Sequence, residues 1–486
     1  MSTFTLINPT TGQAFDEIHR ADVDEVDEAV AQALVAQRSW AAWAPLARAD
    51  ALRAFARVVE NHVDELAALE VLNSGHPIES AQWEANHVAQ VLNYYAGAPE
   101  RLLGAQIPVA GGIDVTFHEP IGVIGVIVPW NFPMTIASWA FAPALAAGNA
   151  VVLKPAELTP LTAVRLGELA LEAGLPAGLF RVITGSGSVV GQRLVTHPDV
   201  RKIVFTGSTE VGTGIAAQAS QLLKPVTLEL GGKSANIIFD DADLAKAAAA
   251  TPGSVFDNAG QDCCARSRVL VQRSVYDRYL ELLEPAVAAW RVGDPNAEGT
   301  DMGPLISSAH RDTVAGFLEG ADVAFRGTAP EGDGWWFAPA VVRAENRRLN
   351  AEADRNSGRA AGAITAVVAD KAAPLAGHAE RTDRIAHDEV FGPVVAVLPF
   401  DDEADAIALA NDSIYGLAGS IWTENLGRGI RVARGVRTGV LSVNSHSSVR
   451  YSTPFGGMKA SGLGRELGPD AAEHFTETKN VFFATE

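Results

Sequence analysis

Apolar residues recur three and four positions apart in the first part of the chain. Between residues 26 and 34, and again between residues 52 and 69, alanine, valine, leucine and phenylalanine fall on one face of a helix. Such a face must be buried against another element. We therefore expect the first hundred residues to be helical and to pack on the segments that follow.

Between residues 123 and 230 the pattern changes to short runs of β-branched and other apolar residues. These runs lie at residues 123–128, 150–153, 180–183, 202–205 and 225–230, and helix-like segments such as 161–173 separate them. The alternation predicts βαβ units, a parallel sheet and helices on both of its faces. Because sites in such sheets lie at the carboxyl ends of the strands, the residues directly after each run are the first candidates for function.

Residues 102–119 show the alternation of apolar and polar side chains that is typical of a β-hairpin. Such a hairpin suits a sheet edge or a contact between subunits, because its outer backbone groups are unpaired. Residues 464–486, at the end of the chain, are the second candidate for a subunit contact.

Residues 121–153 carry no charged side chain, and the stretch is long enough to cross a bilayer. Pro129, Pro133, Pro143 and the adjacent Gly148 and Asn149 interrupt it. Because these residues break a continuous helix, the stretch predicts a strand, a loop, a buried helix and a second strand in a globular core.

Composition and charge narrow the class of protein. The 486 residues suffice for about two to four domains, and 48% hydrophobic with 20% charged residues is typical of a globular chain. Lysine and arginine number 38 against 58 acidic residues, a formal net charge of −20, and no basic run concentrates the opposite sign. We therefore expect no nucleic acid and no membrane as partner.

The cysteines indicate a reducing compartment. The sequence holds two, Cys263 and Cys264, and adjacent cysteines do not readily form an unstrained disulfide. The first ten residues lack the basic segment and apolar core of a secretory signal. We expect a cytoplasmic protein that begins at or near Met1.

Glycine-rich motifs give only weak signals. In GSGSVVG, at 185–191, the third glycine comes one residue late for a dinucleotide fingerprint, and GGKS at 231–234 has Thr227 where a phosphate loop requires glycine. Residues 206–212 are better placed, because a glycine and a serine follow a strand and open a helix whose amides can face a pyrophosphate.

Other catalytic motifs are missing, which leaves the thiols. No serine lies in a G-x-S-x-G frame, and the eleven histidines show no metal-ligand spacing, so we expect neither a serine hydrolase nor a metal site. Cys263 and Cys264 lie in NAGQDCCARSR, at 258–268. Its polar, glycine-containing flanks and the cationic Arg266 and Arg268 favour a reactive thiolate over a buried apolar cysteine.

Seven motifs together resemble the superfamily of NAD(P)-dependent aldehyde dehydrogenases over nearly the whole chain. They are PWNFP at 129–133, KPAE at 154–157, FTGS at 205–208, ELGGK at 229–233, GQDCC at 260–264, EVFGP at 389–393 and PFGGMKASG at 454–462. The resemblance implies an α/β protein with a Rossmann-like parallel-sheet cofactor domain, an α/β catalytic domain and a small β oligomerisation element.

The expected boundaries follow from this resemblance. The NAD-binding domain takes residues 1–101 and 121–230, and the catalytic domain takes residues 231–465. The oligomerisation element takes residues 102–120 and 466–486, and by resemblance the chain forms a homodimer or a homotetramer.

The resemblance also implies a mechanism. Cys263 is the nucleophile that forms a thiohemiacetal with an aldehyde and then a thioester. The side-chain amide of Asn131 and the backbone N–H of Cys263 form the oxyanion hole. Glu229 is the general base that activates the water for hydrolysis of the thioester.

NAD is the cofactor that the resemblance implies, with NADP possible. Its expected contacts are Lys154 and Glu157 at the adenosine ribose, Gly207 and Ser208 at the pyrophosphate, and Trp130, Leu230, Glu389 and Phe391 at the nicotinamide end. A carboxylate at Glu157 repels a 2′-phosphate and so favours NAD.

The substrate is an aldehyde whose identity the sequence leaves open. By resemblance, Met134, Trp139 and Phe455 line an apolar substrate tunnel, although Met134 suits a plain core role equally well. His446, Arg450 and Tyr451 precede Phe455 and face either a polar substrate end or solvent. The segment around Tyr94 and Tyr95 lacks acidic residues, which does not favour an amino aldehyde.

One departure from the family pattern lies between Cys263 and Glu389, which are a few tens of residues farther apart than expected. The excess falls in residues 343–383, an alanine-, arginine- and asparagine-rich segment that we expect to be an unusual insertion in the catalytic domain.

Two alternatives to aldehyde oxidation by hydrolysis remain. In a coenzyme A-acylating dehydrogenase, thiolysis replaces the attack of water, and Glu229 has no obvious role there. In a silent NAD-binding structural protein, intact Cys263, Glu229 and Asn131 have no purpose.

Overall fold

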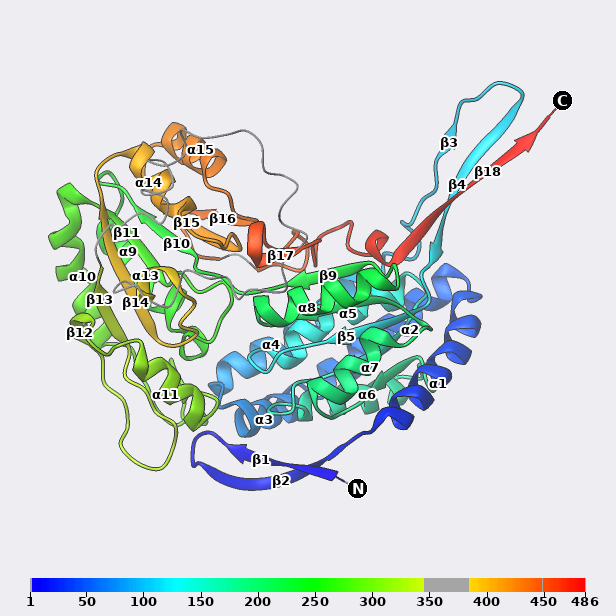
Figure 1. Ribbon diagram of the computed structural model, residues 1–486, viewed down its shortest axis with the longest axis horizontal. Coiled ribbons are helices and arrows are strands. Elements are labelled where there is room, and N and C mark those ends of the chain that lie inside the picture. The colour runs from blue at the N-terminus through cyan, green and yellow to red at the C-terminus, as the bar shows by residue number, and fades with distance from the viewer. Residues whose placement is uncertain (1, 345–383, 448, 486) are drawn as a thin grey trace.

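In the computed structural model, which describes residues 2–344, 384–447 and 449–485, two α/β bodies lie side by side and a β arm projects from one of them (Figure 1). Each body is built on its own sheet, and the site described below lies where the sheets face each other. Among the helices of the described residues, none has the length and apolar character needed to span a membrane.

The first body contains the predicted parallel sheet. Over the described residues its strand order is β17-β9-β8-β5-β6-β7. The strands are β5 (Val123–Ile127), β6 (Ala150–Lys154), β7 (Phe180–Val182), β8 (Val200–Thr206), β9 (Val226–Glu229) and β17 (Gly462–Leu463). Neighbouring strands run parallel except β17, which pairs antiparallel with β9. The five predicted strands and their parallel arrangement are therefore confirmed.

Helices cover this sheet. They are α1 (Val23–Ala41), α2 (Pro45–Asn61), α3 (Val63–Ser74), α4 (Ile78–Tyr95), α5 (Pro133–Ala146), α6 (Leu161–Glu172), α7 (Gln192–Thr196), α8 (Thr209–Gln221) and the π-helical turn η1 (Gly187–Gly191).

The prediction that the first hundred residues are helical is wrong for their start. The strands β1 (Ser2–Asn8) and β2 (Gln13–Arg20) form a hairpin there, because alternating residues turn at Gly12, whose φ is +68°.

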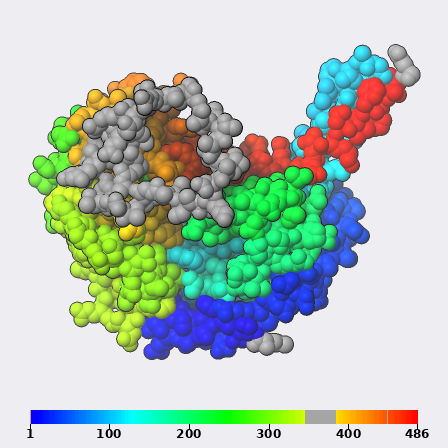
Figure 2. All heavy atoms as spheres, viewed as in Figure 1, coloured from blue at the N-terminus to red at the C-terminus, as the bar shows by residue number. Residues whose placement is uncertain are grey.

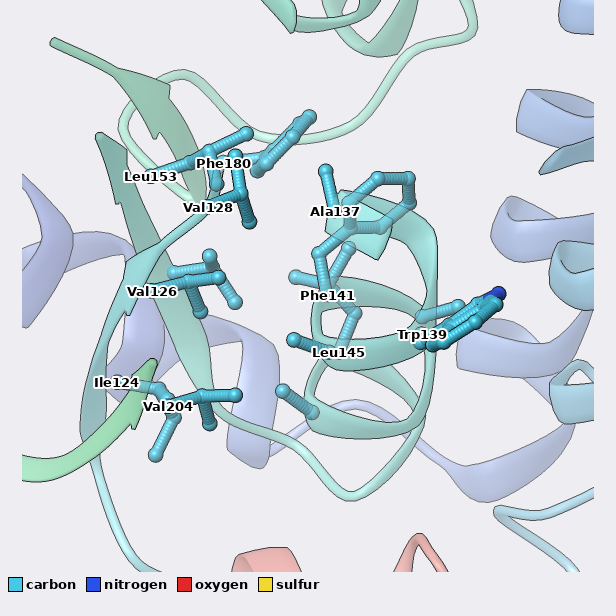
Figure 3. Close-up of a cluster of buried hydrophobic side chains, with 14 of the residues drawn as sticks. Ile124, Val126, Val128, Ala137, Trp139, Phe141, Leu145, Leu153, Phe180 and Val204 are labelled. Carbon is cyan, nitrogen blue, oxygen red and sulfur yellow. The ribbon is translucent and has the colours of Figure 1, made fainter. Parts of the chain in front are cut away.

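The uncharged stretch 121–153 folds as predicted into β5, a loop, α5 and β6. Every residue of α5 is buried. Phe141 and Leu145 point from α5 towards the strands that carry Val126 and Val204, whereas Trp139 points away from the sheet (Figure 3). One face of α5 therefore builds the core and the other is free to line a cavity.

The second body contains a second sheet, with the order β12-β13-β14-β11-β10-β15-β16 over the described residues. Its strands are β10 (Ala235–Ile238), β11 (Arg268–Gln272), β12 (Asp322–Arg326), β13 (Ala340–Arg343), β14 (Val394–Phe400), β15 (Ala418–Trp422) and β16 (Val440–Val443). All neighbours run parallel except β12 and β13. The helices of this body are α9 (Leu244–Val255), α10 (Tyr276–Ala288), α11 (Ser308–Gly316), α13 (Arg384–His387), α14 (Glu403–Asn411) and α15 (Leu426–Gly435). Short 3-10 turns lie at η2 (Asp257–Gly260), η3 (Arg273–Val275), η4 (Lys459–Ser461) and η5 (Glu473–Phe475).

The arm joins the predicted hairpin to the end of the chain. The hairpin strands β3 (Gln106–Ile107) and β4 (Gly112–Pro120) pair antiparallel, and β18 (Thr476–Ala484) pairs antiparallel with β4 along its whole length. The arm stands clear of both bodies (Figure 2). The predicted hairpin is thus confirmed. Of the expected insertion at 343–383, residues 345–383 lie outside the described residues.

Candidate active site

The carboxyl ends of β5, β8 and β9 open into a cavity of about 250 Å³ between the two bodies. Cys263, from the segment between η2 and β11, faces the same cavity. The lining residues are Pro129, Trp130, Asn131, Thr206, Gly207, Ser208, Glu229, Leu230, Gly231, Cys263, Glu389 and Phe391. The structure therefore brings together Cys263, Glu229 and Asn131 with six of the residues expected at the cofactor.

The thiol segment is held in a strained turn. Asn258 and Ala259 have φ values of 48° and 54°, in the left-handed region that side chains rarely adopt. Gln261 fixes the turn, because its side chain donates to the Asn258 carbonyl at 3.0 Å and accepts from the Ile306 N–H at 2.9 Å. Cys263 is half-buried and follows this turn directly.

The hydrogen bond with Cys264 is the largest influence on the pKa of Cys263, which lies well above its usual range; burial and the nearby Asp262 raise it further. The carboxylate of Asp262 accepts from the Cys264 thiol at 3.2 Å. The sequence-based argument that Arg266 and Arg268 favour a thiolate is wrong. Both guanidinium groups are buried and donate to backbone carbonyls, Arg266 to Cys264 and His446, and Arg268 to Lys233.

Asn131 is fixed by reciprocal hydrogen bonds to the thiol segment. Its side-chain nitrogen donates to the Gln261 carbonyl at 2.9 Å, and the side chain of Asn258 donates to the Asn131 carbonyl at 2.7 Å. A side-chain amide has two N–H donors, and Asn131 uses one of them in this bond. The second N–H can serve an oxygen bound beside Cys263.

Glu229 ends β9 as a buried carboxyl group. Burial raises its pKa well above the usual range, and the neighbouring Glu466 raises it further. Glu466 is itself buried, which raises its pKa to about 8 although Lys202 opposes the shift. A Cβ at Gly456 would lie 2.5 Å from Oε1 of Glu229, so only glycine fits beside this carboxyl group. The sequence analysis did not find Glu466.

The cavity offers polar groups that suit the pyrophosphate and nicotinamide parts of a dinucleotide. The hydroxyl of Thr206 is buried and lacks a hydrogen-bond partner among the described residues. Behind it lies the start of α8, whose N-cap Ser208 accepts from the Val211 N–H at 3.3 Å through its side chain and leaves other first-turn amides for an anion.

At the opposite side of the cavity, Glu389 accepts from the Gly232 N–H at 2.7 Å, which directs its carboxylate inward. Burial raises the pKa of Glu389 to about 7. The rings of Trp130 and Phe391 meet edge to face at 5.3 Å. These groups offer acceptors for sugar hydroxyls and a flat apolar surface for a ring.

Lys154 ends β6 and Glu157 follows it, and neither is among the lining residues of this cavity. Lys154 is buried and donates to the Pro155 carbonyl at 2.8 Å, and burial lowers its pKa to about 8. Glu157 accepts from the guanidinium of Arg20 at 2.6 Å. Arg20 lies in β2, a segment that we expected to be helical, so this pair was not predicted.

A second cavity, of about 280 Å³, lies on the other side of Cys263. Its lining residues are Trp83, Phe132, Thr135, Ile136, Trp139, Gly253, Ser254, Asp257, Asp262, Cys263, Cys264, Arg266, His446, Ser447, Val449 and Phe455. Trp139 and Phe455 were expected here, and their rings lie 5.1 Å apart. Met134 is fully buried in the core and is not among the described residues that line either cavity.

Residues of α4 on one side of the second cavity were not predicted from the sequence. Trp83 is half-exposed, and its ring stacks on His87 at 5.0 Å. Trp139 donates to Nε2 of His87 at 3.1 Å, and burial lowers the pKa of His87 to about 4, so this histidine is neutral. The spacing of Trp83 and His87, four residues apart on an amphipathic helix, was the available signal.

Two carboxylates, Asp257 and Asp262, also line the second cavity. Asp257 accepts from the Asn258 N–H at 3.0 Å, and burial raises its pKa to about 6, with Asp262 adding to the shift. Both precede the thiol in sequence, whereas the sequence-based expectation about acidic groups concerned the segment around Tyr94.

The arrangement combines a thiol between two cavities, an amide donor and a carboxyl group. A thiol in this position can attack a carbonyl carbon that enters from the second cavity. Asn131 can donate to the resulting oxyanion, and Glu229 can accept a proton in the first cavity.

Comparisons with known proteins agree with this chemistry. The family model described as "Aldehyde dehydrogenase family" matches residues 1–352 and 375–481. A phenylacetaldehyde dehydrogenase of Pseudomonas fluorescens is 40% identical, over 99% of this chain and 93% of the relative. An aldehyde dehydrogenase of Emericella nidulans is 38% identical, over 99% of this chain and 92% of its own.

Solved structures agree as well. The betaine aldehyde dehydrogenase of Staphylococcus aureus in complex with NAD⁺ superposes with a TM-score of 0.89 at 34% identity, covering 100% of this chain and 92% of that one. The family match and the extent of these similarities show that the chain belongs to the aldehyde dehydrogenase family.

Proposed function

We propose that this chain oxidises an aldehyde to its carboxylic acid with NAD, through covalent intermediates on Cys263. The convergence of Cys263, Asn131 and Glu229 on one cavity, whose other lining residues suit the pyrophosphate and nicotinamide parts of a dinucleotide, carries the proposal. The cavity on the other side of the thiol admits the aldehyde, so the sulfur lies between the two reactants.

In the first step the sulfur of Cys263 forms a bond to the aldehyde carbon, and the carbonyl oxygen becomes negative. The free N–H of Asn131 and the backbone N–H of Cys263 stabilise this charge, and one such donor is worth about 3 kcal/mol in the transition state. Because the pKa of the thiol is raised, attack requires a base, and the carboxylate of Glu229 faces the same cavity.

NAD, when bound, supplies the acceptor for the hydride of the thiohemiacetal. The residues that would hold it are Lys154 and Glu157 at the adenosine ribose, Gly207 and Ser208 at the pyrophosphate, and Trp130, Leu230, Glu389 and Phe391 around the nicotinamide ribose and ring. Arg20 offsets the charge of Glu157, so the repulsion of a 2′-phosphate is weakened and NADP remains possible as well.

The thioester left on Cys263 is then hydrolysed. After Glu229 has released the thiol proton to solvent, its ionised form removes a proton from the attacking water, and the sulfur of Cys263 leaves as the carboxylic acid forms. A water-activating base beside the thiol favours hydrolysis over transfer to coenzyme A, and the intact group of three residues disfavours a silent structural protein.

For the substrate we propose an aldehyde with a cationic nitrogen, such as an ω-amino aldehyde. The relative in P. fluorescens is named for an arylalkyl aldehyde and the neighbour in S. aureus for a cationic aldehyde, so these names favour neither class of substrate for this chain. The second cavity joins Asp257 and Asp262 to the rings of Trp83 and Trp139, and carboxylates with aromatic faces recognise cations. The sequence-based argument against amino aldehydes rested on the segment around Tyr94, whereas Asp257 and Asp262 come from the segment that precedes Cys263.

We further propose the division into an NAD-binding domain at 1–101 and 121–230, a catalytic domain at 231–465 with an insertion at 343–383, and an oligomerisation element at 102–120 and 466–486. The two separate sheets and the projecting arm support it. Adjacent cysteines without a disulfide support a cytoplasmic location.

The arm supports a homodimer or homotetramer. Ile113 pairs with Phe483 on one of its faces, which also carries Phe117 four residues farther along β4, and all three are about half-exposed. Apolar side chains on an exposed sheet face are typical of a protein contact.

Replacing the thiol should abolish the reaction. We expect Cys263→Ala to form no NADH from NAD and a panel of aliphatic, aromatic and amino aldehydes, because no covalent intermediate can form. Cys264→Ala is the matched control and should retain most of the activity. Equal loss of activity in both variants, measured by absorbance of NADH, would contradict the assignment of Cys263.

The pH dependence of kcat should reflect Glu229. Its pKa is raised, so the base is lost as the pH falls through that raised value, and kcat should fall with it. Glu466→Gln removes a like charge, lowers the pKa of Glu229 and should move the acid limb of the kcat profile to lower pH. The exposed Glu473→Gln is the control, and an acid limb that Glu466→Gln leaves in place would exclude this coupling.

The charge of Asp257 should select the substrate. We expect Asp257→Asn to lower kcat/KM for 3-aminopropanal about tenfold or more, as expected for loss of a charge-assisted contact, and to leave that of butanal, its neutral counterpart, little changed. If the wild type turns over butanal or phenylacetaldehyde much better than 3-aminopropanal, the substrate is a neutral aldehyde and this proposal is wrong.

The arm should determine assembly. Ile113→Asp together with Phe483→Asp places two charges on its apolar face and should reduce the mass measured by sedimentation. Phe482→Asp, on the opposite face beside Asp114, is the matched control and should not change that mass. A wild type that sediments as a monomer would overturn the oligomer proposal.

A further inference from the structure

A buried histidine and two buried glutamates meet in the layer of helices behind the site. Glu70 lies in α3, Glu84 lies in α4 and His76 lies in the loop between these helices. Their nearest side-chain atoms, one from each residue, all lie within 4.8 Å of one another. None of the three side chains is more than 3% exposed. The proposed reaction uses none of them.

The two carboxylates are oriented in the same way. A threonine hydroxyl holds the outer oxygen of each one, Thr162 that of Glu70 at 3.0 Å and Thr135 that of Glu84 at 3.4 Å. The inner oxygen of Glu84 forms a hydrogen bond with Nδ1 of His76 at 2.6 Å, and the inner oxygen of Glu70 lies 3.8 Å from the same nitrogen, so an ion bound here would replace the proton between His76 and Glu84. Threonines that orient ligand carboxylates from outside are typical of metal sites.

The inner oxygen of Glu70 is the independent observation that points to a ligand. It is buried and lacks a hydrogen-bond partner among the described residues, since 3.8 Å to His76 is beyond hydrogen-bond distance. A buried carboxylate oxygen without a partner costs free energy that a bound cation would recover. It is directed at the same point as Nδ1 of His76.

The charge around the cluster is negative. Three carboxyl groups act electrostatically on His76, those of Glu84, Glu70 and Asp257. A proton on His76 supplies one positive charge for Glu70 and Glu84, whereas a divalent ion with a neutral His76 balances both. The surroundings therefore favour a divalent cation.

The cluster is accessible. His76 and Glu84 line a cavity of about 370 Å³, together with Pro77, Glu79, Ser80, Trp83, Phe132, Asp257 and Asn258. This cavity gives an ion a path to the cluster and leaves room for a water molecule as fourth ligand.

We propose that Glu70, His76 and Glu84 bind one divalent transition-metal ion, with Zn²⁺ the best match. One imidazole nitrogen and two carboxylate oxygens form a donor set that Zn²⁺ accepts in tetrahedral geometry with one open position. The spacing of six and eight residues along the chain matches no common ligand motif, so the sequence predicted no metal site.

The ion would fasten α3 to α4 and, through Thr135, to α5. The ring of His76 also packs on Phe132 at 5.5 Å, next to Asn131. The site is therefore structural, and it supports the loop that carries the oxyanion donor without touching the reacting atoms.

The experiment measures zinc binding by titration calorimetry on the chelator-treated full chain, with Cys263 and Cys264 both changed to serine so that thiols do not bind the metal. We expect one Zn²⁺ per chain and a melting temperature that rises with zinc concentration. Glu70→Gln and His76→Gln should each weaken binding about tenfold or more. Glu79→Gln, which lines the same cavity outside the cluster, is the matched control and should bind as the parent does.

Thr162→Val keeps all three ligands and removes only the hydroxyl that orients Glu70, so it tests the site even if a ligand variant fails to fold. It should weaken zinc binding and reduce the rise in melting temperature. Absence of stoichiometric binding in the parent, or equal weakening by Glu79→Gln and Glu70→Gln, would overturn the proposal and leave a proton as the cation of the cluster.

Discussion

The hydrogen bonds between Asn131 and the turn at 258–261 join the two bodies where the chemistry takes place. Asn131 follows β5 of the first sheet, whereas Asn258 and Gln261 precede β11 of the second. Neither body alone contains both the thiol and the amide donor. The strain of Asn258 and Ala259 is tolerated because this network fixes the turn from both sides. The geometry of the oxyanion site is therefore set by the docking of the two sheets.

The same docking removes water from three acidic groups. Cys263, Glu229 and Glu466 all have raised pKa values, with burial among the causes in each case. Two buried carboxyl groups side by side cannot both ionise without a large cost, so Glu229 and Glu466 titrate as a coupled pair. The resting site thus holds protons that the reaction must move. The arginines next to the thiol in sequence do not perform this role, since backbone carbonyls bind both.

Sequence alone predicted the parts of the fold that local patterns encode. The apolar runs gave five strands, and the prolines in 121–153 correctly separated a buried helix from a membrane span. The hairpin at 2–20 was not predicted, because short segments of alternating apolar and polar residues at a chain end give only a weak strand signal. The family resemblance carried by the motifs assigned Cys263, Glu229 and Asn131 to one site, and these three residues line one cavity in the structure. Partners supplied by distant segments, such as Glu466 for Glu229 and Arg20 for Glu157, required the folded chain.

The acidic region between α4 and the thiol connects the two proposals about cations. Glu70 and Glu84 lie around His76. Asp257 and Asp262 line the substrate cavity together with Arg266, whose guanidinium donates to the carbonyls of Cys264 and His446. Net negative charge in a low-dielectric interior is costly unless cations compensate it. A divalent ion at Glu70, His76 and Glu84 neutralises the inner part and leaves Asp257 and Asp262 at the substrate cavity. The remaining charge then attracts a cationic aldehyde, so the metal and the substrate compensate different carboxylates and do not compete for one site.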